Sequence, residues 1–407
     1  MRKRTLPLCK MNIAYITNFY PPIRTGTAYY VKDLAKKMAE RGHKIIVITC
    51  FFNSRFSSGV EDGIKVFRLP SIKLPKIRFF LGFDKFYFAF LPGNFSKIIT
   101  ILQTEKVDLL HQCGHLLDLF YFSGRVGKFT KIPTLCSIHT IIHHPSNRFY
   151  DFVLKTLDKS IVRTFGVHKY NAILALDNEI RKYVQNYYEA NKIYCFPFGL
   201  NFDFSKSMGI QNNEITTFQI TSVGHVTEMR NRYSLIEAVR KLVVEKGIKV
   251  HLSIIGKVCT DEPVRLVRKL GLSHVVEFVG ELPRAEVLRR LSKTHVEAHW
   301  ITNPGIGSAA LEAMAIGLPV MAYGYEGILC DVPLKDGENI IFINPNDPDE
   351  IADKLFCMWK YPDIRSQIGT NARKLVEHCL TWEKLISGLE RLYQKILSDY
   401  WDTFDKG

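Results

Sequence analysis

Short apolar segments alternate with amphipathic segments along most of the chain, and this alternation constrains the fold more than any other feature. Asn12–Thr17 predicts a buried strand, residues 28–40 an amphipathic helix, and Lys44–Thr49 a second strand. A strand, a helix and a strand with short connections form a parallel βαβ unit. The same alternation of strands and helices restarts at the strand Thr217–Val223 and continues to about residue 343. The sequence therefore predicts two parallel sheets, each built from βαβ units.

The chain has 407 residues, too many for one ordinary hydrophobic core, so two domains are expected. We place the N-terminal domain at residues 1–202 and the C-terminal domain at 203–382, because the polar stretch Asp203–Glu214 has the composition of a linker. Residues 383–407 predict a helix that packs back on the N-terminal domain. Both domains are expected to be α/β and doubly wound, with ligands bound at the carboxyl ends of the strands.

The composition is that of a soluble globular protein, with 46% hydrophobic and 23% charged residues. Uninterrupted apolar runs are too short to span a membrane, and the first residues lack the apolar core of a signal peptide. The formal net charge of +15 implies an anionic partner, and by itself it leaves nucleic acid, an acidic membrane and a phosphorylated substrate open. The sequence carries no recognised nucleic-acid-binding motif, so nucleic acid is not expected as a partner.

The segment Pro304–Ala322 carries the clearest signal for a ligand. Gly305 and Gly307 precede a short helix-forming run in which Glu312 is the only carboxylate. Glycines at a helix start let a ligand approach the backbone, and the free N–H groups there attract anionic or hydroxyl-rich groups. A carboxylate one turn into the helix can accept hydrogen bonds from sugar hydroxyls. The arrangement therefore predicts a nucleotide-sugar site.

Five motifs follow one another along the chain. They are Pro21-Pro22-Ile-Arg-Thr-Gly26, Arg41-Gly42-His43, Phe198-Gly199-Leu200-Asn201, Phe278-Val279-Gly280-Glu281-Leu282 and Leu311-Glu312-Ala313-Met314-Ala315-Ile316-Gly317-Leu318-Pro319-Val320. In this order and spacing the chain resembles the retaining glycosyltransferases of family 4, from about Met11 to Leu397. The resemblance implies the GT-B fold, which has two doubly wound Rossmann-like domains and an inter-domain cleft.

The resemblance also implies a UDP- or GDP-sugar donor, whose departing diphosphate must be stabilised by cations and N–H groups. Where the family has an arginine and a lysine, this chain has His225 and Arg230. We expect Arg230 to clamp the diphosphate, rather than to be a solvated loop charge, and His225 to lie beside it as a cation or a neutral donor. Gly26 is expected to bring backbone N–H groups to the diphosphate, and the alternative is a simple helix entry capped by Thr25.

Glu312 matches the second glutamate of the family's Glu-x7-Glu pair, which binds the ribose hydroxyls; the alternative is a carboxylate favoured by the helix dipole. The first glutamate, which contacts the donor sugar, is replaced by Pro304, and Asn303 is expected to supply a substitute hydrogen bond. The two glycines and Ser308 are expected to offer backbone donors. Backbone groups around Gly280–Leu282 are expected at the base. The expected donor-binding residues are Gly26, His225, Arg230, Gly280, Leu282, Asn303, Gly305, Gly307, Ser308 and Glu312.

His139 ends an apolar strand and matches the family histidine that faces the donor sugar near the reacting carbon. We expect it to be the catalytic residue, the alternative being a strand-end histidine satisfied locally. An obvious carboxylate nucleophile is missing, which fits retention with the leaving phosphate as base. Two groups of three residues contain side chains that can bind a metal, but in neither group does the sequence indicate that the three side chains converge on one point. No metal and no other cofactor are therefore expected. The trios are His139, His143 and His144, and His111, Cys113 and His115.

Basic and aromatic residues are interleaved between residues 65 and 100, a mixture that suits an anionic bilayer surface. The residues expected to contact the membrane and the acceptor are Lys76, Arg78, Phe79, Phe83, Lys85 and Phe86. The alternative is a partly buried helix with a solvated basic edge. The segment Leu91-Pro92-Gly93-Asn94-Phe95 and the helix after it resemble the family members that glycosylate phosphatidylinositol or diacylglycerol. This resemblance implies a cytoplasmic protein bound peripherally to the inner face of the membrane.

The sequence therefore predicts a retaining glycosyltransferase that moves a hexose from a nucleoside-diphosphate sugar to a lipid or lipid-linked acceptor. Two alternatives stay open. One is a non-catalytic GT-B scaffold that binds a nucleotide or a partner protein, which Pro304, Thr25 and His225 favour because they depart from the family pattern. The other is a transferase with a glycan acceptor, joining sugar to sugar in capsule or lipopolysaccharide assembly.

Overall fold

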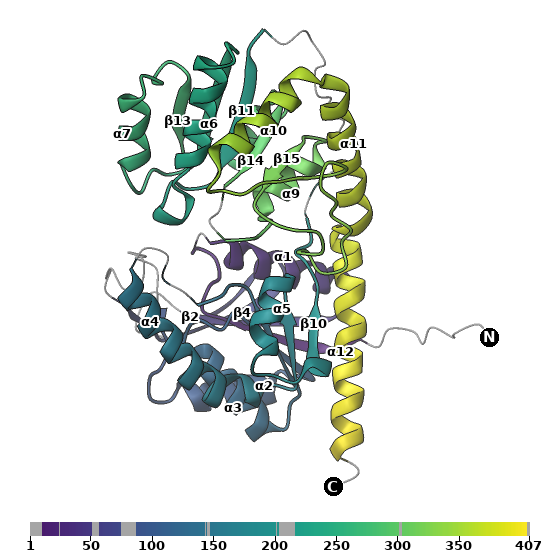
Figure 1. Ribbon diagram of the computed structural model, residues 1–407. Helices are drawn as coiled ribbons and strands as arrows, with labels where there is room; N and C mark the ends of the chain where they lie inside the picture. Colours follow the sequence, from purple (N-terminus) through teal and green to yellow (C-terminus); the bar gives the residue numbers. More distant parts are fainter. Residues whose placement is uncertain are drawn as a thin grey trace, which may run out of the picture. The chain divides into compact units, whose positions relative to one another are not determined.

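The computed structural model describes residues 10–23, 25–50, 57–74, 87–142, 144, 147–200, 202, 216–300 and 303–404. The chain divides into two compact α/β units (Figure 1). Unit 1 comprises Met1–Pro197 together with Glu383–Gly407, and unit 2 comprises Phe198–Trp382. The sequence predicted the boundary between the domains after residue 202, whereas the two units divide after Pro197. The linker proposed at Asp203–Glu214 lies outside the described residues.

Unit 1 is built on an eight-stranded sheet in the order β10-β9-β8-β7-β1-β2-β4-β3, with a separate pair β5-β6. Its strands are β1 (Asn12–Thr17), β2 (Lys44–Cys50), β3 (Ser57–Glu61), β4 (Ile64–Leu69), β5 (Ile72–Lys73), β6 (Tyr87–Phe88), β7 (Leu109–Cys113), β8 (Thr134–Ile138), β9 (Ala172–Ala175) and β10 (Ile193–Cys195). Its helices are α1 (Gly26–Glu40), α2 (Asn94–Thr104), α3 (Leu119–Thr130), α4 (Arg148–Leu157), α5 (Asn178–Gln185) and α12 (Trp382–Phe404), with a π-helix at Asp158–Gly166 and 3₁₀ turns at Val167–Lys169 and Ala190–Lys192.

The large sheet of unit 1 is parallel except at one edge, where β3 pairs antiparallel with β4. The two strands are joined by Asp62 and Gly63, whose φ angles are 51° and 79°. Two consecutive residues with positive φ form the tight turn that suits a β-hairpin, and Asp-Gly is a preferred pair for it. The prediction of a wholly parallel sheet is therefore corrected at this edge.

Helices cover both faces of the unit 1 sheet. Along β1, Ala14 and Ile16 join the hydrophobic cluster that α2 and α3 contribute to. Tyr15 points to the opposite face, because successive strand residues alternate, and its hydroxyl lies 3.2 Å from that of Tyr393 on α12. Figure 1 shows α12 running alongside unit 1 next to β10, where Lys395 lies over the ring of Tyr194.

A buried ion-pair cluster also holds α12 on unit 1. Glu390 on α12 accepts hydrogen bonds from Arg41 Nη2 at 2.9 Å and lies 3.0 Å from His43 Nε2. The Glu390 side chain is only 2% exposed, whereas Glu383, which Arg41 also contacts, is 71% exposed. The Arg41-Gly42-His43 motif that ends α1 and precedes β2 is thus the docking point of the last helix.

Unit 2 contains a six-stranded parallel sheet in the order β13-β12-β11-β14-β15-β16. Its strands are β11 (Phe218–Val223), β12 (Val250–Ile255), β13 (Val276–Gly280), β14 (Val296–His299), β15 (Val320–Ala322) and β16 (Ile341–Phe342). Its helices are α6 (Tyr233–Val244), α7 (Glu262–Lys269), α8 (Arg284–Leu291), α9 (Ser308–Ala315), α10 (Pro348–Lys360) and α11 (Pro362–Cys379), with a 3₁₀ turn at Glu228–Arg230.

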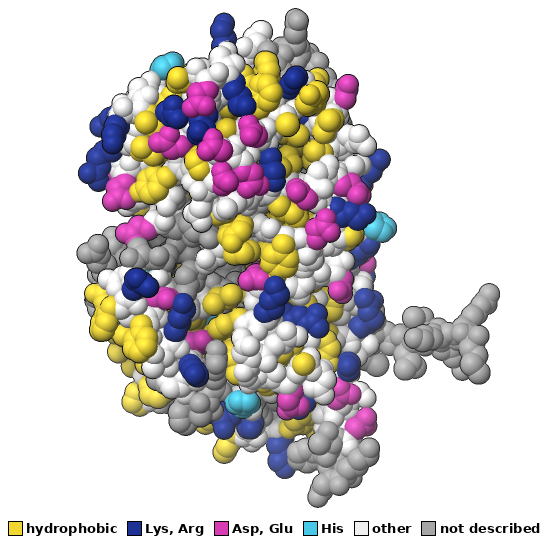
Figure 2. All heavy atoms as spheres, in the orientation of Figure 1, with side chains coloured by type: hydrophobic (Ala, Val, Ile, Leu, Met, Phe, Trp, Pro, Cys, Tyr) yellow, Lys and Arg dark blue, Asp and Glu magenta, His cyan; other side chains and the backbone are white. Residues whose placement is uncertain are grey.

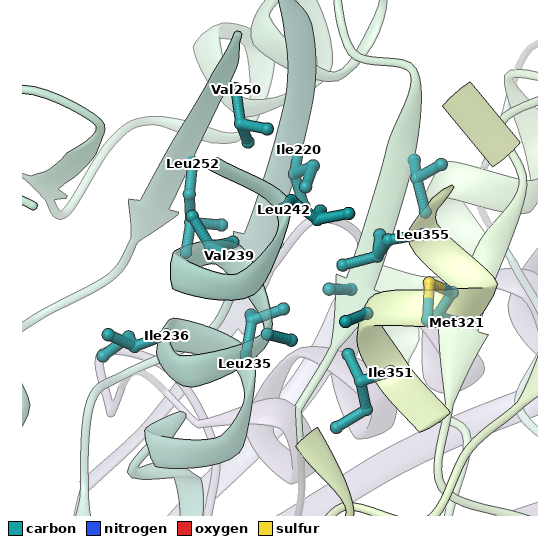
Figure 3. Close-up of a cluster of buried hydrophobic side chains, with 14 of the residues drawn as sticks. Ile220, Leu235, Ile236, Val239, Leu242, Val250, Leu252, Met321, Ile351 and Leu355 are labelled. Carbon is teal, nitrogen blue, oxygen red and sulfur yellow. The ribbon is translucent and has the colours of Figure 1, made fainter. Parts of the chain in front are cut away.

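Each face of the unit 2 sheet has its own hydrophobic core. Figure 3 shows the first, where Val239 of α6 lies near Leu252 of β12 and Leu242 of α6 lies near Ile220 of β11. Leu355 of α10 lies on the side of Met321. The second core joins apolar residues of α8, α9 and α11 to β15. Burying a side chain of this size contributes about 1.5–3 kcal/mol, which explains why the strands are apolar on both faces.

The predicted strand Thr217–Val223 occurs as β11, and the strands predicted at Asn12–Thr17 and Lys44–Thr49 occur as β1 and β2. The fold prediction of two doubly wound Rossmann-like units is confirmed. Among the described residues, every helix is too short or too polar to cross a bilayer.

Candidate functional site

The first group of candidate residues lies at the point in unit 2 where the strand order reverses. From β11 the chain proceeds outward through β12 and β13, and it then returns to the other side of β11 with β14. In an open parallel sheet, the carboxyl ends of the two strands at such a point face a crevice that binds ligands. The segment Gly224–Arg232 follows β11, and the segment up to α9 follows β14.

Arg232, which the sequence analysis did not single out, fixes the segment after β11. Its side chain is completely buried. The guanidinium donates to Ser222 Oγ at 3.1 Å and to the carbonyl oxygens of Gly224 at 2.8 Å and His225 at 3.1 Å. It also donates to the carbonyl oxygen of Arg230 at 2.5 Å. A buried arginine with this many oxygen acceptors holds the backbone of the preceding loop in place.

Arg230, the expected diphosphate clamp, lies against Gly224. A Cβ atom on Gly224 would lie 2.5 Å from Arg230 Nη1, and the φ angle of Gly224 is +133°. Only glycine therefore leaves room for the guanidinium in this loop. Burial lowers the pKa of Arg230 and the nearby Glu297 acts in the opposite direction, but a guanidinium remains charged at neutral pH.

Two buried polar residues of β14 lie beneath this loop. Glu297 Oε1 accepts the Val223 N–H at 3.4 Å, and Oε2 has no partner among the described residues. Burial raises the pKa of Glu297 to about 8, against the lowering effects of the Val223 N–H and the two arginines. The carboxyl group is consequently mostly protonated at pH 7, so it leaves the charge of Arg230 available for an anion.

His299 engages the glycine-rich segment before α9. Its Nε2 accepts the N–H of Gly307 at 3.1 Å, and its Nδ1 is 3.9 Å from Glu297 Oε1. Burial lowers the pKa of His299 to about 3, so the ring is neutral and carries its proton on Nδ1. The N–H of Gly305 is likewise used, since it donates to the Tyr323 carbonyl at 3.0 Å. In this structure the N–H groups of Gly305 and Gly307 are thus bonded within the protein, and their role as donors to a ligand stays a prediction.

Glu312 lies in α9, which begins at the exposed residue Ser308. The N-cap residue of this helix is Gly307. The Glu312 side chain is 17% exposed and accepts a hydrogen bond from Arg284 Nε at 2.7 Å. Arg284, the first residue of α8, holds this carboxylate in one orientation, a contact that was not predicted from the sequence. The carboxylate retains acceptor sites because each of its oxygens can take more than one hydrogen bond.

The remaining donor-site candidates lie at the same end of the sheet. His225 is 57% exposed at its side chain, and its Nδ1 accepts the Lys257 N–H at 3.0 Å. Gly280 ends β13 and Leu282 packs partly buried against the core formed by α8 and α9. Asn303 is exposed before α9. These positions bring the predicted residues to neighbouring strand ends.

The second group of candidates lines a pocket in unit 1, again where the strand order reverses. The loops after β1, β7 and β8 enclose it, and its walls are Asn18, Phe19, Thr27, Cys113, Gly114, His115, Leu116, Leu117, His139 and Thr140. Aspartate, glutamate, lysine and arginine are absent from these lining residues. The pocket is thus lined by neutral polar and apolar groups, which suits hydroxyl groups better than a charged group.

His139 lies at the end of β8 and is held by two hydroxyl groups. Its Nε2 is 2.9 Å from Ser137 Oγ, and its Nδ1 is 3.3 Å from Thr27 Oγ1. The ring of Tyr30 meets it edge to face at 5.3 Å. Burial lowers the pKa of His139 to about 3, so the ring is neutral at physiological pH. A neutral, oriented imidazole can donate or accept a hydrogen bond in the pocket but supplies no full charge.

Gly26 is the first residue of α1, and Thr25 caps the helix by accepting the Ala28 N–H at 3.2 Å. The helix-entry turn considered as the alternative is therefore present. The next residue, Thr27, lines the pocket beside His139. A Cβ atom at Gly26 would meet nothing within 4 Å, so the structure leaves open space at this helix start.

His115 is the most unusual residue of the pocket. It is only 1% exposed, and neither ring nitrogen has a hydrogen-bond partner among the described residues. Burial lowers its pKa to about 4, so the ring is neutral, with one nitrogen as donor and the other as acceptor. Buried polar groups are almost always satisfied, so both nitrogens of this histidine can form hydrogen bonds to a hydroxyl-bearing ligand in the pocket. From the sequence, His115 was considered only as a member of a possible metal-binding trio.

The expected membrane-contact residues Lys76, Arg78, Phe79, Phe83, Lys85 and Phe86 lie outside the described residues. Three or more His, Cys, Asp or Glu side chains placed to hold a metal ion do not occur in the described part of the chain. The prediction that the protein works without a metal stays a prediction.

Comparison with known proteins gives consistent matches over most of the chain. Residues 24–204 match the model of Glycosyltransferase Family 4, and residues 203–375 match that of Glycosyl transferases group 1. A D-inositol 3-phosphate glycosyltransferase of Corynebacterium diphtheriae is 32% identical, with 94% of each chain covered. An uncharacterized glycosyltransferase of Methanocaldococcus jannaschii is 26% identical over 94% of this chain and 98% of its own. The structure of HepE from Anabaena in complex with UDP has a TM-score of 0.67 at 17% identity, and covers 96% of this chain and 100% of its own.

Proposed function

Because this chain belongs to the glycosyltransferases, with a family 4 N-terminal half and a group 1 C-terminal half on the GT-B fold, it is an enzyme that transfers sugars, and we propose which sugars and how. The proposed donor is a UDP- or GDP-hexose. The proposed acceptor is a lipid or a lipid-linked molecule. Transfer is proposed to retain the anomeric configuration of the hexose.

The observation that carries the proposal is the arrangement at the carboxyl ends of β11 and β14. Arg230 is charged and seated in a loop that Arg232 fixes, and the protonated Glu297 beside it does not neutralise it. A departing diphosphate develops negative charge, and a preorganised cation stabilises it without reorganisation. The α9 N-terminus adds a partial positive charge, and Glu312 offers acceptors to ribose hydroxyls. The HepE complex with UDP supports a uridine nucleotide as the donor.

The unit 1 pocket supports the assignment of the acceptor and of retention. His139 and His115 are both neutral, and each can form hydrogen bonds to hydroxyl groups. Since the lining residues include no carboxylate, we propose that no protein nucleophile attacks the sugar and that the departing phosphate removes the acceptor proton. His139 is the proposed catalytic residue that lines the reacting centre. In this scheme a metal ion has no assigned role.

The experiment that tests the proposal is a transfer assay with the full chain. UDP- and GDP-hexoses are offered together with phosphatidylinositol or diacylglycerol in vesicles, and with soluble sugars in parallel. A glycolipid whose anomeric configuration equals that of the donor is the expected product, and NMR of the isolated product determines it. Transfer to soluble glycans alone would instead identify a sugar-to-sugar transferase, and nucleotide binding without turnover would identify a scaffold.

Replacing Glu312 by alanine is expected to raise the donor KM by about 10- to 100-fold, since a hydrogen bond to a charged group contributes about 1.5–3 kcal/mol. The measurement is initial rate against donor concentration. Glu286→Ala is the matched control, because Glu286 is a carboxylate on the neighbouring α8 that pairs with Arg289. An unchanged donor KM in Glu312→Ala would remove Glu312 from the donor site.

Replacing His115 by phenylalanine is expected to raise the acceptor KM by roughly tenfold or more, because the ring keeps its volume and loses both polar nitrogens. The rate of donor hydrolysis without acceptor should not change. His115→Asn retains a donor and an acceptor and should recover most of the affinity. The control is His168→Phe, since His168 is an exposed histidine of the same unit. Equal acceptor KM values in the wild type and His115→Phe would contradict this role.

A further inference from the structure

Helix α4 differs from the other helices of unit 1 because none of its residues is buried. Phe149 is 69% exposed and Phe152 is 68% exposed. The start of the helix is fixed by Asn147, whose side chain accepts the N–H groups of Phe149 and Tyr150 at 3.0 Å each. The two phenylalanines are thus presented to solvent from an ordered helix turn.

Basic residues surround the two phenylalanines on the same face. At 3.6 residues per turn, Arg148, Phe149, Phe152 and Lys155 fall on one side of α4, and all four are exposed. Lys159, also exposed, follows in the next turn. Figure 2 shows hydrophobic side chains with Lys and Arg side chains beside them over α4. We call these five residues the α4 face.

The one carboxylate within α4, Asp151, pairs with a single cation of this face. Asp151 lies toward the protein, where it accepts the His144 N–H at 2.9 Å, and it also pairs with Lys155 at 2.7 Å. Among the described residues, neither Arg148 nor Lys159 forms a hydrogen bond or an ion pair with a carboxylate. A surface that combines cations with bulky apolar rings matches an anionic bilayer, in which headgroups meet the cations and rings enter the interface.

We propose that the α4 face docks the protein on an anionic lipid surface, with Phe149 and Phe152 entering the interface and the three cations contacting headgroups. The proposal rests on the lipid acceptor proposed above. The pocket residues His139 and Thr140 follow β8, and α4 begins eight residues after Thr140. Docking at α4 therefore attaches to the lipid surface a helix that follows the wall of the acceptor pocket closely in the chain, and a lipid acceptor would come from that surface.

The test is vesicle flotation of the full chain without any sugar nucleotide, so that its outcome does not depend on transferase activity. Vesicles of phosphatidylcholine with phosphatidylglycerol are compared with pure phosphatidylcholine. The double variant Phe149→Ser/Phe152→Ser is expected to partition about tenfold or more weakly onto the anionic vesicles. Arg148→Glu/Lys159→Glu is expected to lose binding most strongly at low salt. Wild-type partitioning by both double variants would overturn the proposal.

The matched control is Ile364→Ser on α11, because Ile364 is a large apolar residue that is 48% exposed beside an exposed carboxylate, Asp363, rather than between cations. Its partitioning should equal that of the wild type, and an equal loss in the control would overturn the specific role of α4. Circular dichroism confirms that each variant folds. Sedimentation velocity over a range of concentrations tests the alternative that the α4 face binds a second copy of the protein. If the wild type self-associates and the double serine variant does not, the α4 face is a protein interface and the lipid proposal fails.

Discussion

Replacing Arg230 by alanine is expected to lower kcat/KM for the donor by about 100- to 1,000-fold, the usual effect of removing one preorganised group that stabilises transition-state charge. The structure gives the reason. The guanidinium sits in a loop shaped by Gly224 and held by Arg232, while the protonated Glu297 leaves it without a counter-charge. The variant should also bind UDP or GDP more weakly, which isothermal titration calorimetry measures directly.

Arg230 is a better target than Arg232 for this test. Arg232 is completely buried and donates to four oxygen atoms, so its removal would disturb the fold as well as the site. Arg240→Ala supplies the control, since Arg240 lies on α6 in a surface pair with Glu237 at 3.0 Å. If Arg230→Ala retained wild-type nucleotide affinity and kcat/KM, the diphosphate would have to bind elsewhere.

Replacing Glu390 by alanine is expected to lower the free energy of unfolding of unit 1 by about 3 kcal/mol or more, because breaking a buried ion pair leaves its partners uncompensated. Arg41 and His43 would lose their shared acceptor on α12. Urea denaturation followed by circular dichroism measures the change. Glu383→Ala is the internal comparison: it removes the exposed carboxylate that contacts the same arginine, and it should cost about 0–1 kcal/mol. Equal effects of the two substitutions would contradict a special role for the buried pair.

The same cluster predicts a dependence of stability on pH. Burial tends to raise the pKa of Glu390, but the hydrogen bonds from Arg41 and His43 outweigh it and the pKa is lowered. A carboxyl group with a lowered pKa in the folded state stabilises the fold above its unfolded pKa, and this contribution is lost as the pH falls through the folded pKa. The stability gap between the wild type and Glu390→Gln should therefore narrow below about pH 4.

The sequence was sufficient to predict the two sheets, because most of their strands are mainly apolar and are bounded by polar turns. It was less informative about the edge of unit 1, where β3 is mostly exposed and lacks such a run. The Asp62-Gly63 pair was a hairpin signal in the sequence, and giving it weight would have predicted the antiparallel edge.

The residues of the candidate site could be predicted only in part from the sequence, for a different reason. Arg230 and Glu312 could be proposed from motif positions, but Arg284 and Arg232 act through contacts that exist only after folding. Likewise, no pattern shows that His299 already takes the N–H of Gly307. One signal was available, since Glu297 and His299 interrupt a strand that is otherwise apolar, and polar residues inside a buried strand deserve a functional or structural explanation.

The return of α12 to unit 1 has a consequence for protein engineering. Unit 2 occupies the middle of the chain, from Phe198 to Trp382, so in topological terms it is an insertion into unit 1. A gene cut near residue 197 would produce a first fragment without the helix that buries Tyr15 and pairs with His43. A chimera that exchanges nucleotide specificity should therefore transplant the inserted unit between two fixed ends, keeping the C-terminal helix of the host protein.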